Sequence, residues 1–153
     1  MASCRGVGCK GNVSPRTLIR NPLATEDTRE RLRQFFENCS LDSALDELAF
    51  WEMCTDVVAK SDNFSNGWLS RLRGAGYRRR DLMRDVKELV HFAQDHALNF
   101  DTGQLDELEQ AANSARLPET VKVVESSRRH VEVLLEPKLE AFRKEMRHQH
   151  NMT

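Results

Sequence analysis

Apolar residues recur along this chain at the three- and four-residue spacing of amphipathic helices, and no stretch alternates long enough to predict a strand. We expect a first helix that begins after Thr25, whose hydroxyl can cap an acidic first turn, and that ends near Cys39. A second helix follows almost at once, with one apolar stripe from Leu41 to Val58. Phe50 falls off that stripe, which indicates a helix packed on two sides.

Residues 61–76 interrupt this pattern with Asn, Ser and Gly, and they predict a long loop with a single turn around Trp68. A third helix is expected from about residue 79 to 97, and residues 98–101 then form a short connector. Asp101, with a glutamine three positions on, resembles a capping box and predicts the start of a short helix.

Two prolines divide the rest of the chain. Pro118 suits the first turn of a helix that carries apolar residues as far as Leu135. Pro137 predicts a break or kink, because proline lacks a backbone N–H and clashes with the preceding turn. A final helix then carries Leu139, Phe142 and Met146.

These elements predict an all-α fold, a multi-helix bundle over residues 25–147. A flexible basic tail at 1–24 precedes the bundle, and a short tail at 148–153 follows it. The length of 153 residues suits one domain with a buried core. No apolar run approaches the roughly 18 residues that a membrane-spanning helix needs, so we do not expect a transmembrane protein.

The charge balance argues against constitutive nucleic-acid binding. The formal net charge is −1, from 23 Lys and Arg against 24 Asp and Glu. A nucleic-acid binder usually carries a basic surplus, because its affinity comes largely from neutralising phosphates. Positive charge is concentrated in the first 25 residues, which hold no acid.

The four cysteines form no C-x-x-C pair, and the chain does not start with the apolar stretch of a signal peptide. We therefore expect a cytoplasmic protein with free thiols. Cys4 and Cys9 lie in the basic tail, where S-acylation would add a lipid chain to positive charge and attach the protein to the inner face of the plasma membrane. The favoured alternative is a disordered tail with two ordinary thiols. Cys39 and Cys54 are expected to pack as small hydrophobes.

Catalytic motifs are missing: the chain has no phosphate-binding glycine loop, no nucleophile elbow and no H-E-x-x-H. We therefore expect no catalytic chemistry of its own, no metal and no cofactor. His148 and His150 are the candidate metal pair, but a frayed helix end is favoured. Arg78–Arg79–Arg80 could bind phosphate or acidic lipid, but a solvated helix start is favoured. A helical binding module is the class that remains.

Two separated motifs allow a more specific hypothesis. Phe35-Phe36 and Ser40 precede Leu45-x-x-Leu48-Ala49-Phe50-Trp51-x-x-Cys54, and after the next long helix comes Leu98-Asn99-Phe100-Asp101. In order and spacing, these motifs resemble the signature of the regulator of G-protein signalling (RGS) homology domain. The resemblance covers about residues 28–145.

This resemblance implies a nine-helix, all-α domain whose partner is the GTP-loaded α subunit (Gα) of heterotrimeric G proteins. Such a domain accelerates GTP hydrolysis by stabilising the switch regions of Gα, whose own residues perform the chemistry. Asn99 matches the connector asparagine that touches the switch region in the family. The alternative is that Asn99 only tolerates an awkward turn conformation. Asp46 matches the family's acidic residue four positions before the Phe-Trp pair.

Other candidate Gα-binding positions depart from the family pattern. Glu47 stands where the family commonly has asparagine, and an ionised carboxylate only accepts hydrogen bonds. Near the end, the family has Asp, then Ser, then Arg about one turn later, and the corresponding residues here are Pro137, Lys138 and Ala141. These departures support an alternative, an RGS-fold interaction module that has lost GTPase-activating activity. A third hypothesis is an unrelated helical scaffold.

Overall fold

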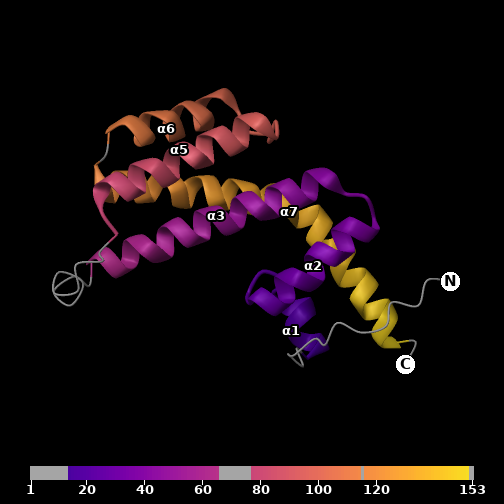
Figure 1. Ribbon diagram of the computed structural model, residues 1–153. Coiled ribbons are helices and arrows are strands. Elements are labelled where there is room, and N and C mark those ends of the chain that lie inside the picture. The colour runs from indigo at the N-terminus through magenta and orange to yellow at the C-terminus, as the bar shows by residue number, and fades with distance from the viewer. Residues whose placement is uncertain (1–13, 66–76, 115, 152–153) are drawn as a thin grey trace. The chain divides into compact units, whose positions relative to one another are not determined.

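The structure is a computed structural model that describes residues 14–65, 77–114 and 116–151 (Figure 1). These ranges contain helices and no strand, which confirms the all-α prediction. The expected nine helices are not confirmed, because the described ranges contain six: α1 (Pro15–Arg20), α2 (Glu26–Asn38), α3 (Asp42–Ser65), α5 (Arg79–Asp95), α6 (Thr102–Ser114) and α7 (Leu117–Asn151).

Backbone contacts divide the chain into two compact units. The terminal unit is formed by Met1–Ser40 together with Pro137–Thr153, and the central unit by Leu41–Glu136. Helix α7 contributes its first part to the central unit and its last part to the terminal unit. The predicted domain boundaries at residues 25 and 147 stay predictions.

The terminal unit buries apolar residues of α1, α2 and the end of α7. Phe36 and Phe142 are fully buried, and the Phe35 ring meets Phe142 edge-on, with ring centroids 5.5 Å apart. Arg143 Nε donates a hydrogen bond of 3.0 Å to the carbonyl of Ile19, which ties α7 to α1.

Part of the predicted flexible tail is helical, so that prediction is wrong for residues 15–20. Ser14 caps α1 by accepting a hydrogen bond from the Thr17 N–H, and Pro15 occupies the first turn. Leu18 is buried. One turn with a single buried side chain is too short to show helical periodicity, which is why the sequence pattern did not predict it. Residues 1–13 lie outside the described part of the chain.

The N-terminus of α2 confirms its prediction, because Thr25 Oγ1 accepts a hydrogen bond of 3.2 Å from the Thr28 N–H. Helix α3 is longer than expected and continues to Ser65, so residues 61–65 are not a loop. The Ser61 hydroxyl is buried and donates to the Val57 carbonyl at 2.8 Å, which satisfies it inside the helix. The rest of the predicted loop, including Trp68, lies outside the described residues.

The expected break or kink at Pro137 is not a break, because α7 runs through it without interruption, and the kink stays a prediction. Proline removes one backbone donor, while the residues around it retain theirs. Leu135 is buried in the central unit, and Leu139 and Phe142 are buried in the terminal unit, so α7 carries buried apolar residues on both sides of the proline. The helix also continues to Asn151, so the predicted tail at 148–153 is helical over its first residues.

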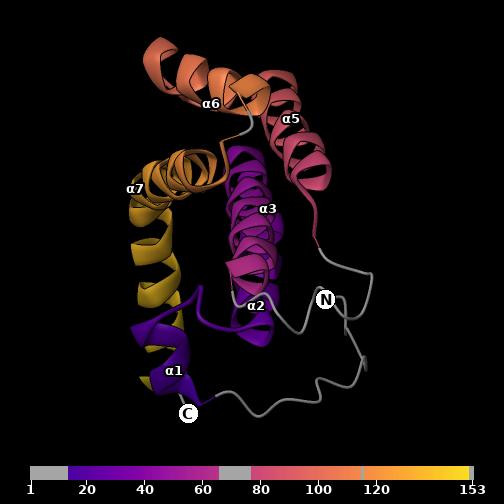
Figure 2. The same cartoon turned by 90° about the vertical axis from the view of Figure 1, so that its left-hand side faces the viewer.

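In the central unit, α5 packs against both α3 and α6 (Figures 1 and 2). The buried face of α5 is the predicted one and consists of Leu82, Val86, Leu89, Val90 and Ala93. Phe50 is fully buried although it lies off the main stripe of α3, so this helix is packed on two sides as expected. Trp51 Nε1 donates to Glu132 Oε1 at 2.9 Å and ties α3 to α7.

The α6 cap is half of the predicted capping box. Asp101 Oδ1 accepts a hydrogen bond of 2.8 Å from the Gln104 N–H, which places the helix start as predicted. The Gln104 side chain does not complete the box, because its Oε1 is buried with no hydrogen-bond partner among the described residues.

A polar cluster joins the end of α3 to the start of α5. The Tyr77 hydroxyl donates to Asp85 Oδ2 at 2.7 Å, and Lys60 Nζ lies 3.7 Å from the same oxygen. Lys60 Nζ also stands 5.8 Å from the centre of the Tyr77 ring. Burial, followed by the hydrogen bond to Asp85, raises the pKa of Tyr77 above its ordinary range, so the phenol keeps its proton.

We expect Tyr77→Phe to lower the free energy of unfolding by about 1–2 kcal/mol, because it leaves the largely buried Asp85 carboxylate without this donor. Urea denaturation followed by circular dichroism measures the change. Arg80→Ala, at an exposed position of α5, is the control and should change stability by less than about 0.5 kcal/mol. Equal stability of Tyr77→Phe and the unaltered chain would contradict the role of this cluster.

The two described cysteines differ in environment. Cys54 is fully buried, as expected, and burial raises the pKa of its thiol from 9.0 to about 12, with Arg128 opposing this less strongly. Cys39 is exposed, so the expectation that it packs as a core residue is wrong. It follows the last residue of α2 and lies beyond the stripe that buries Leu32 and Phe36.

These environments predict unequal thiol reactivity. In a Cys4→Ser/Cys9→Ser variant at about pH 8, we expect one thiol, Cys39, to react rapidly with an aromatic disulfide reagent and Cys54 to react only on unfolding. Rapid labelling of both thiols in the folded chain would refute this placement.

The free energy of unfolding should also fall as the pH rises from about 9 to about 12, because the unfolded chain loses the Cys54 proton first.

Candidate functional site

Asp46 of α3 pairs with a histidine at the end of α5. Asp46 Oδ1 lies 3.1 Å from His96 Nδ1, and the two side chains are 33% and 43% exposed. The His96 ring also stacks on Phe92, with ring centroids 4.1 Å apart. A neutral imidazole protonated at Nδ1 donates a hydrogen bond to the carboxylate, and a protonated one adds charge attraction. Either form of the imidazole links α3 to His96, the residue that follows the last residue of α5.

The turn after α5 depends on one residue in the left-handed conformation. Ala97 has a φ of 48°, and the N–H groups of Ala97 and Leu98 bond back to the carbonyls of Gln94 and Ala93. This is a Schellman motif, in which glycine usually occupies the left-handed position. Alanine there is strained, because its Cβ approaches the following carbonyl. The turn directs the chain into the connector at residues 98–101.

Asn99 is exposed on that connector. Its carbonyl oxygen lies 3.1 Å from His130 Nε2 of α7, while its side-chain amide makes no hydrogen bond to the described residues. The residues with positive φ in the described chain are Ser40 and Ala97, so the alternative that Asn99 tolerates an awkward turn gains no support. An exposed amide can both donate to and accept from a partner.

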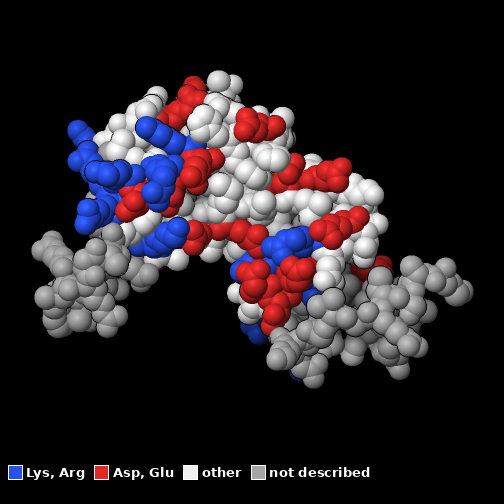
Figure 3. All heavy atoms as spheres, viewed as in Figure 1, with Lys and Arg blue, Asp and Glu red and all other residues white. Residues whose placement is uncertain are grey.

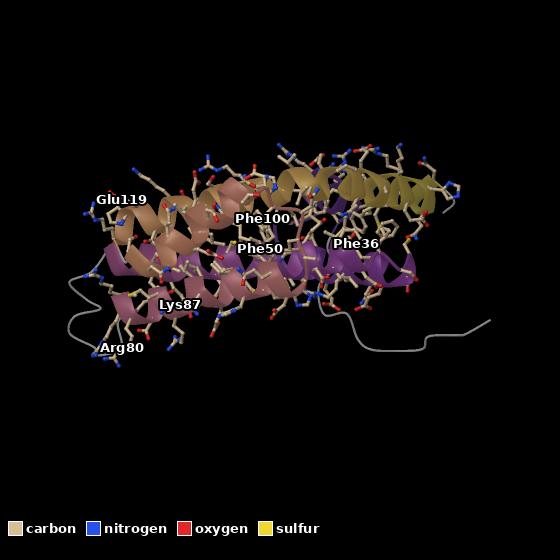
Figure 4. The ribbon with its side chains drawn as sticks, turned by 90° about the horizontal axis from the view of Figure 1, so that it is seen from above. Phe36, Phe50, Arg80, Lys87, Phe100 and Glu119 are labelled. Atoms are coloured by element: carbon tan, nitrogen blue, oxygen red, sulfur yellow. The ribbon has the colours of Figure 1, made fainter. Side chains whose placement is uncertain are left out.

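The side chain after Asn99 anchors the connector. The Phe100 ring stacks on His130, with ring centroids 5.1 Å apart and an interplanar angle of 27°. It also meets the Phe50 ring edge-on, with ring centroids 5.2 Å apart (Figure 4). Phe50 belongs to the Phe-Trp pair of α3. The structure therefore brings together the two motifs on which the sequence hypothesis rests.

The other predicted site residues lie elsewhere or are buried. Glu47 is 6% exposed, so little of its side chain reaches the surface. Lys138 belongs to the terminal unit and is half-buried, and Pro137 and Ala141 of the same unit are exposed. Cys4 and Cys9, the predicted acylation sites, lie outside the described residues.

Two histidines that contact the candidate site residues gave no signal in the sequence. His96 and His130 showed no partner pattern, because their contacts come from residues distant in sequence. Val133, one turn beyond His130 on α7, is 71% exposed and is the large apolar side chain most exposed in the described chain.

No metal site is found in the part of the chain that the structure describes. His148 and His150 stand two positions apart in the last turn of α7, and side chains at that spacing do not face each other. In the same described part, no helix is both long and apolar enough to span a membrane.

Basic side chains gather over the start of α5 (Figure 3). Arg78, Arg79 and Arg80 are exposed there. The acidic residues that follow pair with a neighbouring arginine, because Asp81 and Asp85 each lie within 3.5 Å of Arg84. This arrangement fits the solvated helix start that the sequence favoured.

Comparison with protein-family models, with curated proteins and with solved structures finds no match for this chain.

We expect Ala97→Gly to raise the free energy of unfolding by about 0.5 kcal/mol, because glycine adopts the left-handed conformation without strain but gains freedom in the unfolded chain. Ala59→Gly, at an exposed helical position of α3, should lower it by about 0.5–1 kcal/mol. Urea denaturation of the two variants measures both changes. A similar loss of stability in both would show that Ala97 is not strained.

Proposed function

We propose that this chain is an RGS-like domain that binds the GTP-loaded α subunit of heterotrimeric G proteins and accelerates its GTP hydrolysis by stabilising the switch regions. The observation that carries the proposal is the contact between Phe50 and Phe100, whose rings belong to the two motifs that resemble the RGS signature. A chance match in sequence gives no reason for these motifs to meet in space. The proposed partner implies a cytoplasmic location, with Cys4 and Cys9 as candidate acylation sites.

The exposed groups around this contact suit the proposed role. The Asn99 amide offers a donor and an acceptor, and the part-exposed Asp46 carboxylate offers an acceptor for a backbone N–H or a cation of Gα. The Asp46 carboxylate is held by His96 and the backbone of Asn99 by His130, so little backbone ordering is needed on binding. A surface that holds the switches in their transition-state arrangement accelerates hydrolysis without contributing a reacting group.

The alternative function is an RGS-fold interaction module without GTPase-activating activity. Two observations favour it. Glu47, at a position where the family has an amide, is almost fully buried. Pro137 and Ala141 are exposed but uncharged, at positions where the family has Asp and Arg. This alternative predicts binding to a partner with no change in the rate of GTP hydrolysis.

The test is single-turnover GTP hydrolysis by a panel of purified Gα subunits, with and without the chain. We expect at least one Gα to be accelerated about tenfold or more, and Asn99→Ala to remove most of that acceleration, because a preorganised hydrogen bond to the transition state is lost. Asn113→Ala, at an exposed position of α6, is the matched control and should keep the acceleration within about twofold.

No acceleration of any Gα by a chain that circular dichroism shows to be helical would refute the GTPase-activating function. Acceleration that Asn99→Ala leaves unchanged would count against the connector as the contact surface.

A further inference from the structure

The connector that carries Asn99 is held by a side chain from a different helix. His130 of α7 lies 31 residues further along the chain, and its Nε2 lies 3.1 Å from the Asn99 carbonyl oxygen. The same ring stacks on Phe100 at 5.1 Å. His130 therefore contacts the connector twice, through its edge nitrogen and through its face.

These contacts fix one peptide group. The peptide between Asn99 and Phe100 has its oxygen at His130, and its N–H donates to the Leu98 carbonyl at 2.7 Å. A planar peptide group can turn only as a whole, through the ψ angle before it and the φ angle after it. Hydrogen bonds at both its oxygen and its N–H oppose that rotation. Its orientation sets the ψ angle of Asn99 and thereby helps to set where the Asn99 side chain points.

We propose that His130 is the positioning residue for Asn99 and determines how strongly this surface acts on its partner. The proposal rests on the function proposed above. His130 is a positioning residue because it acts through the backbone of Asn99. The contact requires a proton on Nε2 for donation to the carbonyl, which both the Nε2–H tautomer and the imidazolium provide. Its ring stacking supplies a second restraint that does not depend on the proton.

Two substitutions separate the donor from the ring. His130→Phe keeps an aromatic ring on Phe100 but has no N–H for the Asn99 carbonyl. His130→Gln loses the ring and retains an amide N–H of similar reach. His91→Phe, at an exposed position of α5, is the matched control for a histidine replaced by phenylalanine.

The experiment is single-turnover GTP hydrolysis by a responsive Gα at increasing concentrations of each variant, which separates the maximum rate from the half-saturating concentration. We expect His130→Phe to lower the maximum acceleration by about tenfold, since small misplacements of a positioned group are costly. His130→Gln should recover most of it, and His91→Phe should change nothing. The double variant His130→Phe/Asn99→Ala should be no slower than Asn99→Ala alone, because both act through one contact.

Backbone amide chemical shifts, measured on the free chain in the absence of Gα, report on the conformation of the connector. His130→Phe should shift the amides of Asn99 and Phe100 and leave those of α2 unchanged. An accelerating chain in which His130→Phe has no effect, or in which the two losses multiply, would overturn the role of His130 alone. If the unaltered chain accelerates no Gα, the proposed function fails, and the role of His130 fails with it even where these amide shifts are seen.

Discussion

Burial of the Phe50 ring is the interaction on which the central unit and its candidate site depend. Phe50 is fully inaccessible and meets Phe92 of α5 and Phe100 of the connector, with ring centroids 6.3 and 5.2 Å apart. Tilted and edge-on aromatic contacts add about 0.5–1.5 kcal/mol each to the gain from burial. A single side chain of α3 therefore holds both α5 and the segment that follows it, and the exposed surface beside Asn99 rests on this packing.

Polar contacts at the surface extend this apolar anchor. His96 and His130 each use one ring in two ways, stacking on a phenylalanine and reaching an oxygen, on Asp46 and on Asn99 respectively. Each histidine joins a helix to a residue far away in sequence. The strain at Ala97 is consistent with such a site, because a strained turn persists only where the surrounding contacts determine it. Rigid exposed groups of this kind lose little freedom when a partner binds them.

Much of the helix pattern could be predicted, because long amphipathic helices place apolar residues at a regular three- and four-residue spacing. Thr25 and Asp101 marked helix starts correctly, since capping depends on local side-chain chemistry. The short helix around Leu18 was missed because one buried residue gives no period. No break occurs at Pro137, because the loss of one backbone donor does not end a helix that has buried residues on both sides of it. The candidate site was predictable at Asp46 and Asn99 only through resemblance. His130 was not predictable, because its contact with Asn99 depends on how α7 packs.

We propose that the surface around Asp46 and Asn99 recognises Gα in the geometry of GTP hydrolysis. The most direct measurement is the affinity of the chain for one Gα loaded with GDP alone and with GDP plus aluminium fluoride, which imitates the transferring phosphate. A surface complementary to the transition state should bind the aluminium fluoride form at least about tenfold more tightly. Equal affinity for the two forms, or no binding to either, would contradict the account.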